Sequence, residues 1–222
     1  MANVVSYSLW GKEDHYYDGA FKNIELVQKF YPGFAARFYC SPSLPDKYRN
    51  KYEEAGAEIE IVSEGKDDWR GLFWRFYALE EDGIVLIRDT DSRIHQREVD
   101  AVEYWLNTRF DFHAMRDHME HTTVPILGGM FGARNGILKD IKNQIRLWTP
   151  RNQKGNDQDF LRQKIWPQVR DKSIVHCRYA NRTRFTKEYT YDPFRFFGKH
   201  KILPFPTQMV NGQFVGEIVK DD

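Results

Sequence analysis

The stretch GIVLIRDTDSRI, residues 83–94, joins a short apolar run to two aspartates separated by one residue. An apolar run of this length that ends in polar residues is typical of a buried strand. Such a strand would carry Asp89 and Asp91 to the carboxyl edge of a sheet, where open α/β folds bind ligands. Two carboxylates there suit a hard divalent cation that carries a substrate diphosphate. A strand-end turn in which one Asp caps the next segment explains the spacing equally well.

Strand-like and helix-like segments alternate along the rest of the chain. Before the aspartates, strands are expected at 4–10, 35–41 and 58–63 and helices at 20–32, 45–56 and 69–81. After them, helices are expected at 99–108, 136–148 and 159–170 and strands at 112–118, 125–133 and 173–179. The tail from Asn181 is rich in Pro, aromatic and basic residues, and we expect loops that cover the site. The sequence predicts a single α/β domain whose mostly parallel, mixed central sheet is flanked by helices.

Composition excludes several classes of protein. The 222 residues can bury a substantial core, and 33 Lys and Arg against 32 Asp and Glu create no overall field for nucleic acid or an anionic membrane. The two cysteines, Cys40 and Cys177, lie too far apart in sequence to suggest a disulfide framework or structural zinc site, and a reducing compartment fits. Because no signal peptide and no run of 18 apolar residues is present, we expect a cytoplasmic protein without a membrane span.

A second acidic pair, Asp157 and Asp159, flanks Gln158 at the start of a predicted helix. Helix N-caps and first turns favour acidic residues, which gives one explanation of the pair. The other is that one carboxylate hydrogen-bonds the hydroxyls of a sugar or acts at its anomeric carbon. The sequence leaves both explanations open.

Three further features are candidates for a site. The adjacent Gly128 and Gly129 interrupt a strand-like run, which indicates a bulge or a ligand close to the backbone. Arg93 lies next to the first acidic pair and can donate charge-assisted hydrogen bonds to a diphosphate. His176 is either a buried core histidine or a ligand for a manganese-type ion. The three histidines within residues 113–121 lack the spacing of a helical zinc motif, so zinc is disfavoured.

Taken in order, these segments resemble the GT-A nucleotide-sugar glycosyltransferases. The likeness is to compact single-domain enzymes of large algal viruses and some bacteria, and more distantly to family-8 galactosyltransferases and glycogenins. The segments that carry it are SYSLWG (6–11), GLFWRFYAL (71–79), IVLIRDTDSRI (84–94), FHAMRDH (112–118), VPILGGMFG (124–132), DQDFL (157–161) and NGQFVGEI (211–218). The resemblance implies a Rossmann-like GT-A domain over residues 1–222. Its nucleotide-binding half, 1–91, would end in the D-x-D motif, and residues 92–222 would form the acceptor and sugar half.

The resemblance also implies roles for individual residues. In such enzymes the D-x-D carboxylates, here Asp89 and Asp91, hold Mn²⁺ or Mg²⁺ on the donor diphosphate. The first strand and its loop cradle the base, and an arginine before the D-x-D strand reaches the donor. The expected donor-binding set is Ser6, Leu9, Trp10, Arg75, Arg93, Gly128 and Gly129.

The DQD element of family 8 contacts the donor sugar, so we expect Asp157, Gln158 and Asp159 to be catalytic. Family-8 enzymes also use a metal-binding histidine within an H-x-x-G-x-x-K pattern. The residues after His176 do not reproduce this pattern. The expectation that His176 binds the metal ion therefore rests on the chemistry of imidazole alone.

The implied reaction transfers a hexosyl or deoxyhexosyl group from a nucleotide-sugar donor, with a UDP-sugar favoured, to a glycan, glycoprotein or other hydroxyl acceptor. The DQDFL element favours retention by analogy, and the viral likeness extends the expected location to the cytoplasm of an infected host cell. One alternative is a non-catalytic sugar-binding module. Another is an aspartyl phosphatase, although Arg93 stands where those enzymes place Thr or Val. A sugar nucleotidylyltransferase needs a Gly-rich, Arg-containing loop that SLWGKEDH, residues 8–15, does not supply.

Overall fold

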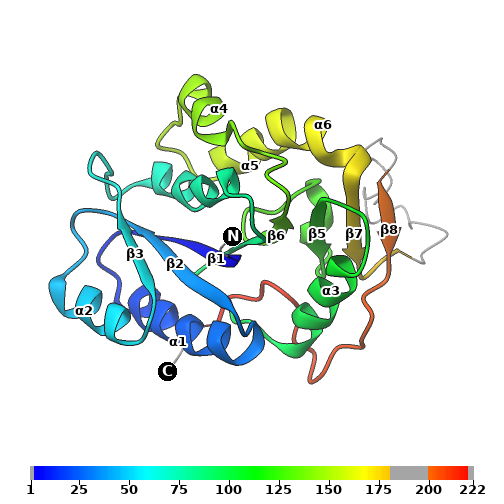
Figure 1. Cartoon of the computed structure of the whole chain (residues 1–222), viewed down its shortest axis with the longest axis horizontal. Helices are drawn as coiled ribbons and strands as arrows, with labels where there is room; N and C mark the ends of the chain where they lie inside the picture. Colours follow the sequence, from blue (N-terminus) through cyan, green and yellow to red (C-terminus); the bar gives the residue numbers. More distant parts are fainter. Residues whose placement is uncertain (1–2, 181–199, 220–222) are drawn as a thin grey trace.

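The computed structural model describes residues 3–180 and 200–219, and within them one eight-stranded sheet in the order β3-β2-β1-β4-β6-β5-β7-β8 (Figure 1). Only β6 runs antiparallel to its neighbours, β4 and β5. The strands are β1 (Asn3–Leu9), β2 (Phe34–Cys40), β3 (Glu58–Ile61), β4 (Val85–Arg88), β5 (Phe112–Arg116), β6 (Met130–Ala133), β7 (Ser173–Cys177) and β8 (Lys201–Leu203). The predicted mixed, mostly parallel α/β sheet is confirmed.

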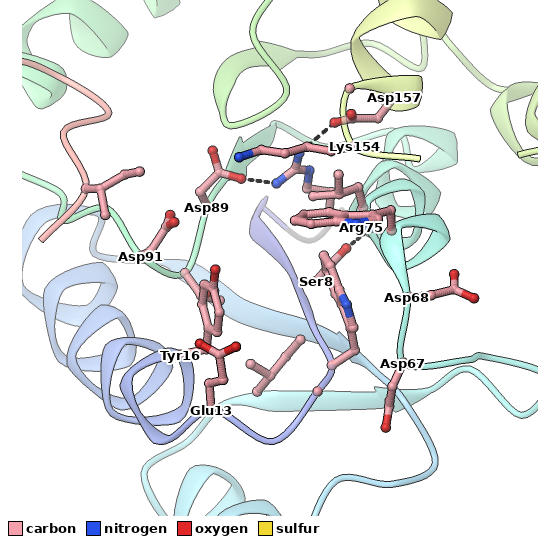
Figure 2. A pocket seen from close by; sticks show the side chains of 18 of the residues that line it. Ser8, Glu13, Tyr16, Asp67, Asp68, Arg75, Asp89, Asp91, Lys154 and Asp157 are labelled. Atoms are coloured by element: carbon pink, nitrogen blue, oxygen red, sulfur yellow. Dashed lines mark hydrogen bonds and ion pairs between the residues drawn. The ribbon is translucent and has the colours of Figure 1, made fainter. Parts of the chain in front are cut away.

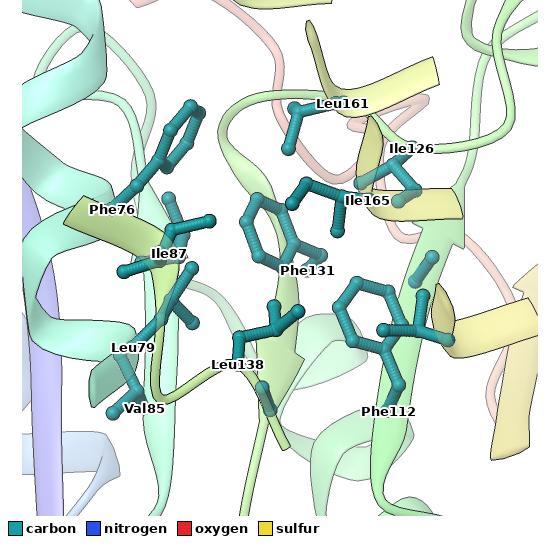
Figure 3. Close-up of a cluster of buried hydrophobic side chains, with 14 of the residues drawn as sticks. Phe76, Leu79, Val85, Ile87, Phe112, Ile126, Phe131, Leu138, Leu161 and Ile165 are labelled. Carbon is teal, nitrogen blue, oxygen red and sulfur yellow. The ribbon is translucent and has the colours of Figure 1, made fainter. Parts of the chain in front are cut away.

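Helices cover both faces of the sheet and bury a separate apolar cluster on each. One face carries α1 (Asp14–Phe30), α2 (Asp46–Glu54) and α3 (Gln96–Leu106). The other carries the 3-10 helix η1 (Trp69–Glu80), α4 (Ile141–Trp148), α5 (Asn156–Phe160), the π-helix η3 (Leu161–Ile165) and α6 (Trp166–Val169). Short 3-10 turns lie at Glu120–Thr123 and Arg170–Lys172. Figure 3 shows part of the second cluster, where Phe76 of η1 and Phe131 of β6 pack together.

The first half of the chain folds as the alternating pattern predicts. Strands β3, β2, β1 and β4 run parallel to one another, and β4 is completely buried. The strand ends at Arg88, immediately before Asp89. The two aspartates of the D-x-D motif therefore lie at the carboxyl edge of a parallel sheet, as expected.

The segment Trp69–Glu80 differs from its prediction, because it forms a 3-10 helix rather than an amphipathic α-helix. Two serines of β1 bind the backbone of Arg75 in the middle of this helix. Ser6 Oγ donates to the Arg75 carbonyl at 2.8 Å, and the Arg75 N–H donates to Ser8 Oγ at 2.8 Å. These two bonds hold η1 on the end of β1.

Three other predictions in the second half need correction. The strand expected at 125–133 is shorter, because Gly128 and Gly129 lie in the turn before β6. The helix expected at 159–170 is divided into α5, η3 and α6, since Pro167 in the first turn of α6 has no N–H to continue an α-helical ladder. Part of the tail forms β8 beside β7. The rest of the tail prediction partly concerns residues 181–199, which lie outside the described residues.

A buried polar network fixes the end of β4 where the D-x-D motif begins. Arg88 Nε donates to Glu98 of α3 at 2.7 Å, and Tyr31, the C-cap of α1, donates to the same carboxylate oxygen at 3.0 Å. Arg88 also donates to the carbonyls of Ile87 and Phe131. Because this charge pair is almost fully removed from water, each member depends on the other for its polar contacts.

We therefore expect Glu98→Ala to lower the free energy of unfolding by about 3–5 kcal/mol, since it leaves the Arg88 guanidinium buried without its counter-charge. Glu103→Ala, an exposed position on the same helix, is the control and should change it by less than about 0.5 kcal/mol. Urea unfolding followed by circular dichroism measures both. Equal losses in the two variants would contradict the importance of the network.

Candidate active site

A pocket of about 740 Å³ opens at the carboxyl edge of β1 and β4 (Figure 2). Its walls come from five parts of the chain: the end of β1 with the start of α1, the start of η1, the D-x-D turn, the loop into α5, and the C-terminal segment. Acidic side chains outnumber basic ones among the residues that line it. The acids are Glu13, Asp67, Asp68, Asp89, Asp91 and Asp157, and the bases are Lys12, Arg75 and Lys154. This surplus of negative charge favours a bound cation.

The floor of the pocket is organised by one buried arginine. The guanidinium of Arg75 pairs with Asp89 through one terminal nitrogen and with Asp157 through the other, the latter at 3.1 Å. The Arg75 side chain is 4% exposed, whereas the Asp89 side chain is 42% exposed and reaches the pocket. Burial lowers the pKa of Arg75, but the charges of Asp89 and Asp157 more than compensate and the net shift is upward. The arginine thus stays charged and brings the two acidic motifs together.

The glycine pair predicted to approach a ligand instead makes room for these side chains. A Cβ on Gly129 would overlap the Asp89 carboxylate, and a Cβ on Gly128 would lie 2.8 Å from Asp157 Oδ2 and 2.5 Å from an Arg75 nitrogen. Neither glycine lines the pocket. Their role in donor binding therefore stays a prediction, while their role in packing the Arg75 ion pairs follows from the geometry.

The two D-x-D carboxylates differ in environment. Burial and the nearby charge of Asp89 raise the pKa of Asp91 to about 6. The backbone of this turn is also restrained, because Asn23 of α1 donates to the carbonyls of Thr90 and Ser92. Both carboxylates face the same pocket, where the charge of Asp89 disfavours that of Asp91.

The DQD element is split between the pocket and the surface. Asp157 and Gln158 line the pocket, and burial raises the pKa of Asp157 despite its ion pair with Arg75. Asp159 does not line it and pairs with Arg162 at 3.0 Å on the exposed side of the helix. The helix N-cap is Gly155, and no side chain caps this end. Neither aspartate is therefore the N-cap, but both lie in the first turn of α5, with Asp157 at the pocket and Asp159 at the surface.

Gln158 is oriented by backbone groups near the glycine pair. With its amide placed to satisfy both partners, its nitrogen donates to the Ile126 carbonyl at 2.9 Å and its oxygen accepts from the Gly128 N–H at 2.7 Å. The loop between β5 and β6 thus supports both the Arg75 ion pairs and the α5 residues that reach the pocket.

Besides the two glycines, Ser6 and Arg93 of the predicted donor-binding set also lie outside the pocket. Ser6 is fully buried and holds the backbone of Arg75, whereas Ser8, two residues later on the same face of β1, lines the pocket. Arg93 donates to the carbonyls of Thr90 and Ser92, both at 2.9 Å, and supports the D-x-D turn from the α1 side. Both side chains stabilise the site through the backbone, and direct contact with a donor stays a prediction. Leu9 and Trp10 line the pocket as expected.

The structure places His176 in the core, which favours the structural explanation over metal binding. It is fully buried in β7, its Nδ1 lies 2.8 Å from His113 Nε2 of β5, and Tyr104 and Phe205 pack against its ring. It does not line the pocket that holds Asp89 and Asp91. Burial lowers the pKa of His176 to about 4 and that of His113 well below its ordinary value.

This histidine pair makes stability depend on pH. In the unfolded chain His176 binds a proton below pH about 6.5. In the folded chain it does so only below a pKa of about 4. The stability contributed by neutral His176 is therefore complete above pH about 6.5. It is lost as the pH falls towards the folded pKa of about 4, and the free energy of unfolding then decreases by at most about 1.4 kcal/mol per pH unit. We expect His176→Gln to flatten the dependence of urea stability on pH between 7 and 4.5, while Gln153→Ala, which changes no titratable group at an exposed position, leaves the slope unchanged. Identical slopes in all three proteins would contradict the assignment.

Several pocket residues were missed from the sequence. Ser8 could have been found from its position at the end of β1, where open α/β sheets bind ligands. Lys154 lies in a segment that the sequence shows only as polar, yet its side chain extends above Arg75 towards Asp89 (Figure 2). Glu13, Tyr16, Asp67 and Asp68 had no distinguishing pattern.

Metal binding would need ligands from outside the protein. Within residues 3–180 and 200–219, no group of three or more His, Cys, Asp or Glu side chains is arranged to hold a metal ion. Asp89 and Asp91 can supply two carboxylate ligands. This number fits Mg²⁺ or Mn²⁺ carried on a diphosphate, because such ions keep several water molecules and take further oxygens from the substrate.

Comparison with known proteins supports the fold. The sequence matches no protein-family model and no curated protein. A glycosyltransferase involved in the glycosylation of the major capsid of PBCV-1 has a similar structure, with a TM-score of 0.53 and 16% identity over 81% of this chain and 82% of that one. The mannosyltransferase PcManGT from Pyrobaculum calidifontis, solved with GDP-Man and Mn²⁺, is also similar, with a TM-score of 0.52 and 14% identity. The match covers 78% of this chain and 54% of that one.

The mixed sheet and these two neighbours show that the chain has the GT-A fold, as the sequence resemblance implied. None of the helices in the described part of the chain has the length and apolar character needed to cross a lipid bilayer.

Proposed function

We propose that this protein is a metal-dependent glycosyltransferase that moves a sugar from a nucleoside diphosphate to a hydroxyl acceptor. The observation that carries the proposal is the Arg75 ion-pair bridge, which holds the D-x-D carboxylate Asp89 and the DQD carboxylate Asp157 in one pocket. The resemblance favours UDP as the nucleotide, a hexosyl or deoxyhexosyl donor, and a glycan or glycoprotein acceptor. The first half of the chain would bind the nucleotide, and the second half would bind the sugar and acceptor.

The proposed metal site consists of Asp89 and Asp91. Their carboxylates are hard oxygen ligands in a pocket with excess negative charge, so they fit Mn²⁺ or Mg²⁺. A bound divalent ion would act as a Lewis acid that offsets the charge developing on the leaving diphosphate. Arg75 would fix the orientation of Asp89, because one of its terminal nitrogens pairs with that carboxylate and the other with Asp157.

The environment of the two DQD aspartates argues against either of them as the base of an inverting reaction. An inverting reaction needs a carboxylate that can deprotonate the acceptor hydroxyl. Asp157 is buried and paired with Arg75, and Asp159 lies outside the pocket in a pair with Arg162. Neither is well placed as a free base. In a retaining reaction the leaving diphosphate can guide the hydroxyl on the same face, so Asp157 and Gln158 would instead orient the donor sugar.

The metal site predicts the binding behaviour of two variants. Asp89→Asn and Asp91→Asn should each weaken Mn²⁺-dependent binding of UDP at least about tenfold, because a neutral amide is a poorer ligand for a hard cation. Asp18→Asn, at an exposed position on α1, is the control and should bind as the wild type does. Calorimetry with and without Mn²⁺ measures all four proteins. Unchanged binding in both site variants would reject the metal assignment.

The DQD element predicts a separation of binding from transfer. Asp157→Asn should keep most of the Mn²⁺-dependent affinity for UDP but lose about 10²–10³-fold in turnover of the nucleotide sugar, since it removes a preorganised contact near the reacting centre. Asp159→Asn should retain turnover, because its side chain is outside the pocket. Mass spectrometry of released UDP and of product, per folded molecule, tests both.

Full turnover in Asp157→Asn would remove this residue from the catalytic machinery. Nucleotide-sugar binding without transfer or hydrolysis in the wild type would instead support a non-catalytic sugar-binding module. Metal-dependent release of phosphate from simple phosphomonoesters would support an aspartyl phosphatase.

A further inference from the structure

The C-terminal segment Phe214–Val219 forms part of the pocket wall next to the D-x-D turn. Gly216 and Ile218 line the pocket, and Ile218 forms an antiparallel bridge with Ser92. The Val219 N–H donates to the carbonyl of Asp91 at 2.7 Å. The backbone of a proposed metal ligand is thus bonded directly to a segment more than a hundred residues away in sequence.

The other end of this segment is attached to a buried carboxylate that the proposed reaction does not use. Asp117 follows β5 and is completely buried. Its Oδ2 accepts a hydrogen bond from the Val215 N–H at 3.0 Å. The backbone N–H of Asp117 itself donates to His121 Nδ1, and the neighbouring His118 ring stacks on Phe214 with centroids 4.7 Å apart. The residues after β5 therefore bind the start of the C-terminal segment through a hydrogen bond and a ring contact.

Arg97 of α3 completes the attachment. It donates to both oxygens of Asp117, each at 2.7 Å, and to the carbonyl of Thr207, and its guanidinium lies 4.1 Å from the centre of the Phe205 ring. Phe205 and Val215 are buried together with Met115 and Met130. One charge pair therefore anchors the polypeptide on both sides of residues 208–213.

We propose that Asp117 is a positioning residue, which holds the C-terminal segment against Asp91 and so completes the donor pocket. The inference rests on the proposed function. It gives a role to Asp117 of the segment FHAMRDH (112–118), which the proposed metal and sugar sites do not use. The segment has one isolated bridge and no helix, so its backbone has few hydrogen bonds of its own to fix it. Its placement depends on Asp117 at one end and on Asp91 at the other.

A purely structural role for Asp117 would affect stability and leave donor affinity per folded molecule intact. A positioning role affects the donor site even in molecules that remain folded. The distinction is measurable, because the Val219 end of the segment can be altered without touching the buried Arg97–Asp117 pair. Val219 is only partly buried, and the residue before it is in an extended bridge, which a following proline tolerates.

The test compares Asp117→Asn with Val219→Pro and Val219→Ala. Proline at 219 removes the N–H that donates to Asp91, whereas alanine keeps it. We expect Val219→Pro and folded Asp117→Asn to bind UDP with Mn²⁺ about five- to tenfold more weakly than the wild type, corresponding to the loss of one or two hydrogen bonds. Val219→Ala should bind at least about fivefold more tightly than Val219→Pro. In turnover, the KM for the donor should rise while kcat changes less, and the melting temperature of Val219→Pro should stay close to that of Val219→Ala.

The outcomes distinguish failure of the proposed function from failure of the positioning role alone. If the wild type fails to bind UDP with Mn²⁺, the proposed function is overturned and this inference with it. If the wild type binds and Val219→Pro binds equally well, only the positioning role is overturned. If Asp117→Asn does not fold, equal binding by the two Val219 variants overturns the role, and weaker binding by Val219→Pro supports the contact with Asp91 through which the role acts. Folded Asp117→Asn with wild-type affinity and donor KM also overturns the role.

Discussion

The site depends on the burial of one charged guanidinium. Arg75 is removed from water and balanced by Asp89 and Asp157, which approach it from opposite sides of the pocket floor. A buried charge without partners costs several kcal/mol, so the three side chains are placed together or not at all. This constraint explains the glycine pair at 128–129, because a side chain at either position would occupy the space that the ion pairs need. It also joins the two acidic motifs, which are separated by almost seventy residues.

The fold supplies the positions that this ion pair requires. Strand β4 delivers Asp89 to the carboxyl edge of the sheet, and the Arg88–Glu98–Tyr31 network fixes the end of that strand to α1 and α3. On the opposite face, Ser6 and Ser8 of β1 bind the backbone of Arg75 and hold η1 on the end of β1. Helices on the two faces thus restrain the two sides of the same ion pair.

The C-terminal segment adds a wall that neither half of the sheet provides. Its attachment uses a second buried ion pair, Arg97–Asp117, at the end of β5. The two ion pairs have similar chemistry but act on different parts of the pocket. Arg75 organises the floor, and Asp117 binds the C-terminal segment that forms one wall. Both lie at carboxyl ends of the central strands, where side chains can leave the sheet and backbone groups remain available for bonding.

The sequence by itself determined the α/β class, the parallel first half and the position of Asp89 and Asp91 at a strand end, because these follow from local apolar periodicity and its abrupt termination. It also identified Arg75, Asp157 and Gln158 as members of one site through resemblance. Only the tertiary structure decided which side chains face the pocket. Ser6, Arg93 and Asp159 have suitable chemistry but point elsewhere, and His176 is buried against His113. Lys154 and Ile218 reach the pocket from segments that have no helical or strand-like hydrophobic periodicity. Side-chain direction at a strand end or in a loop depends on long-range packing, which local sequence patterns do not contain.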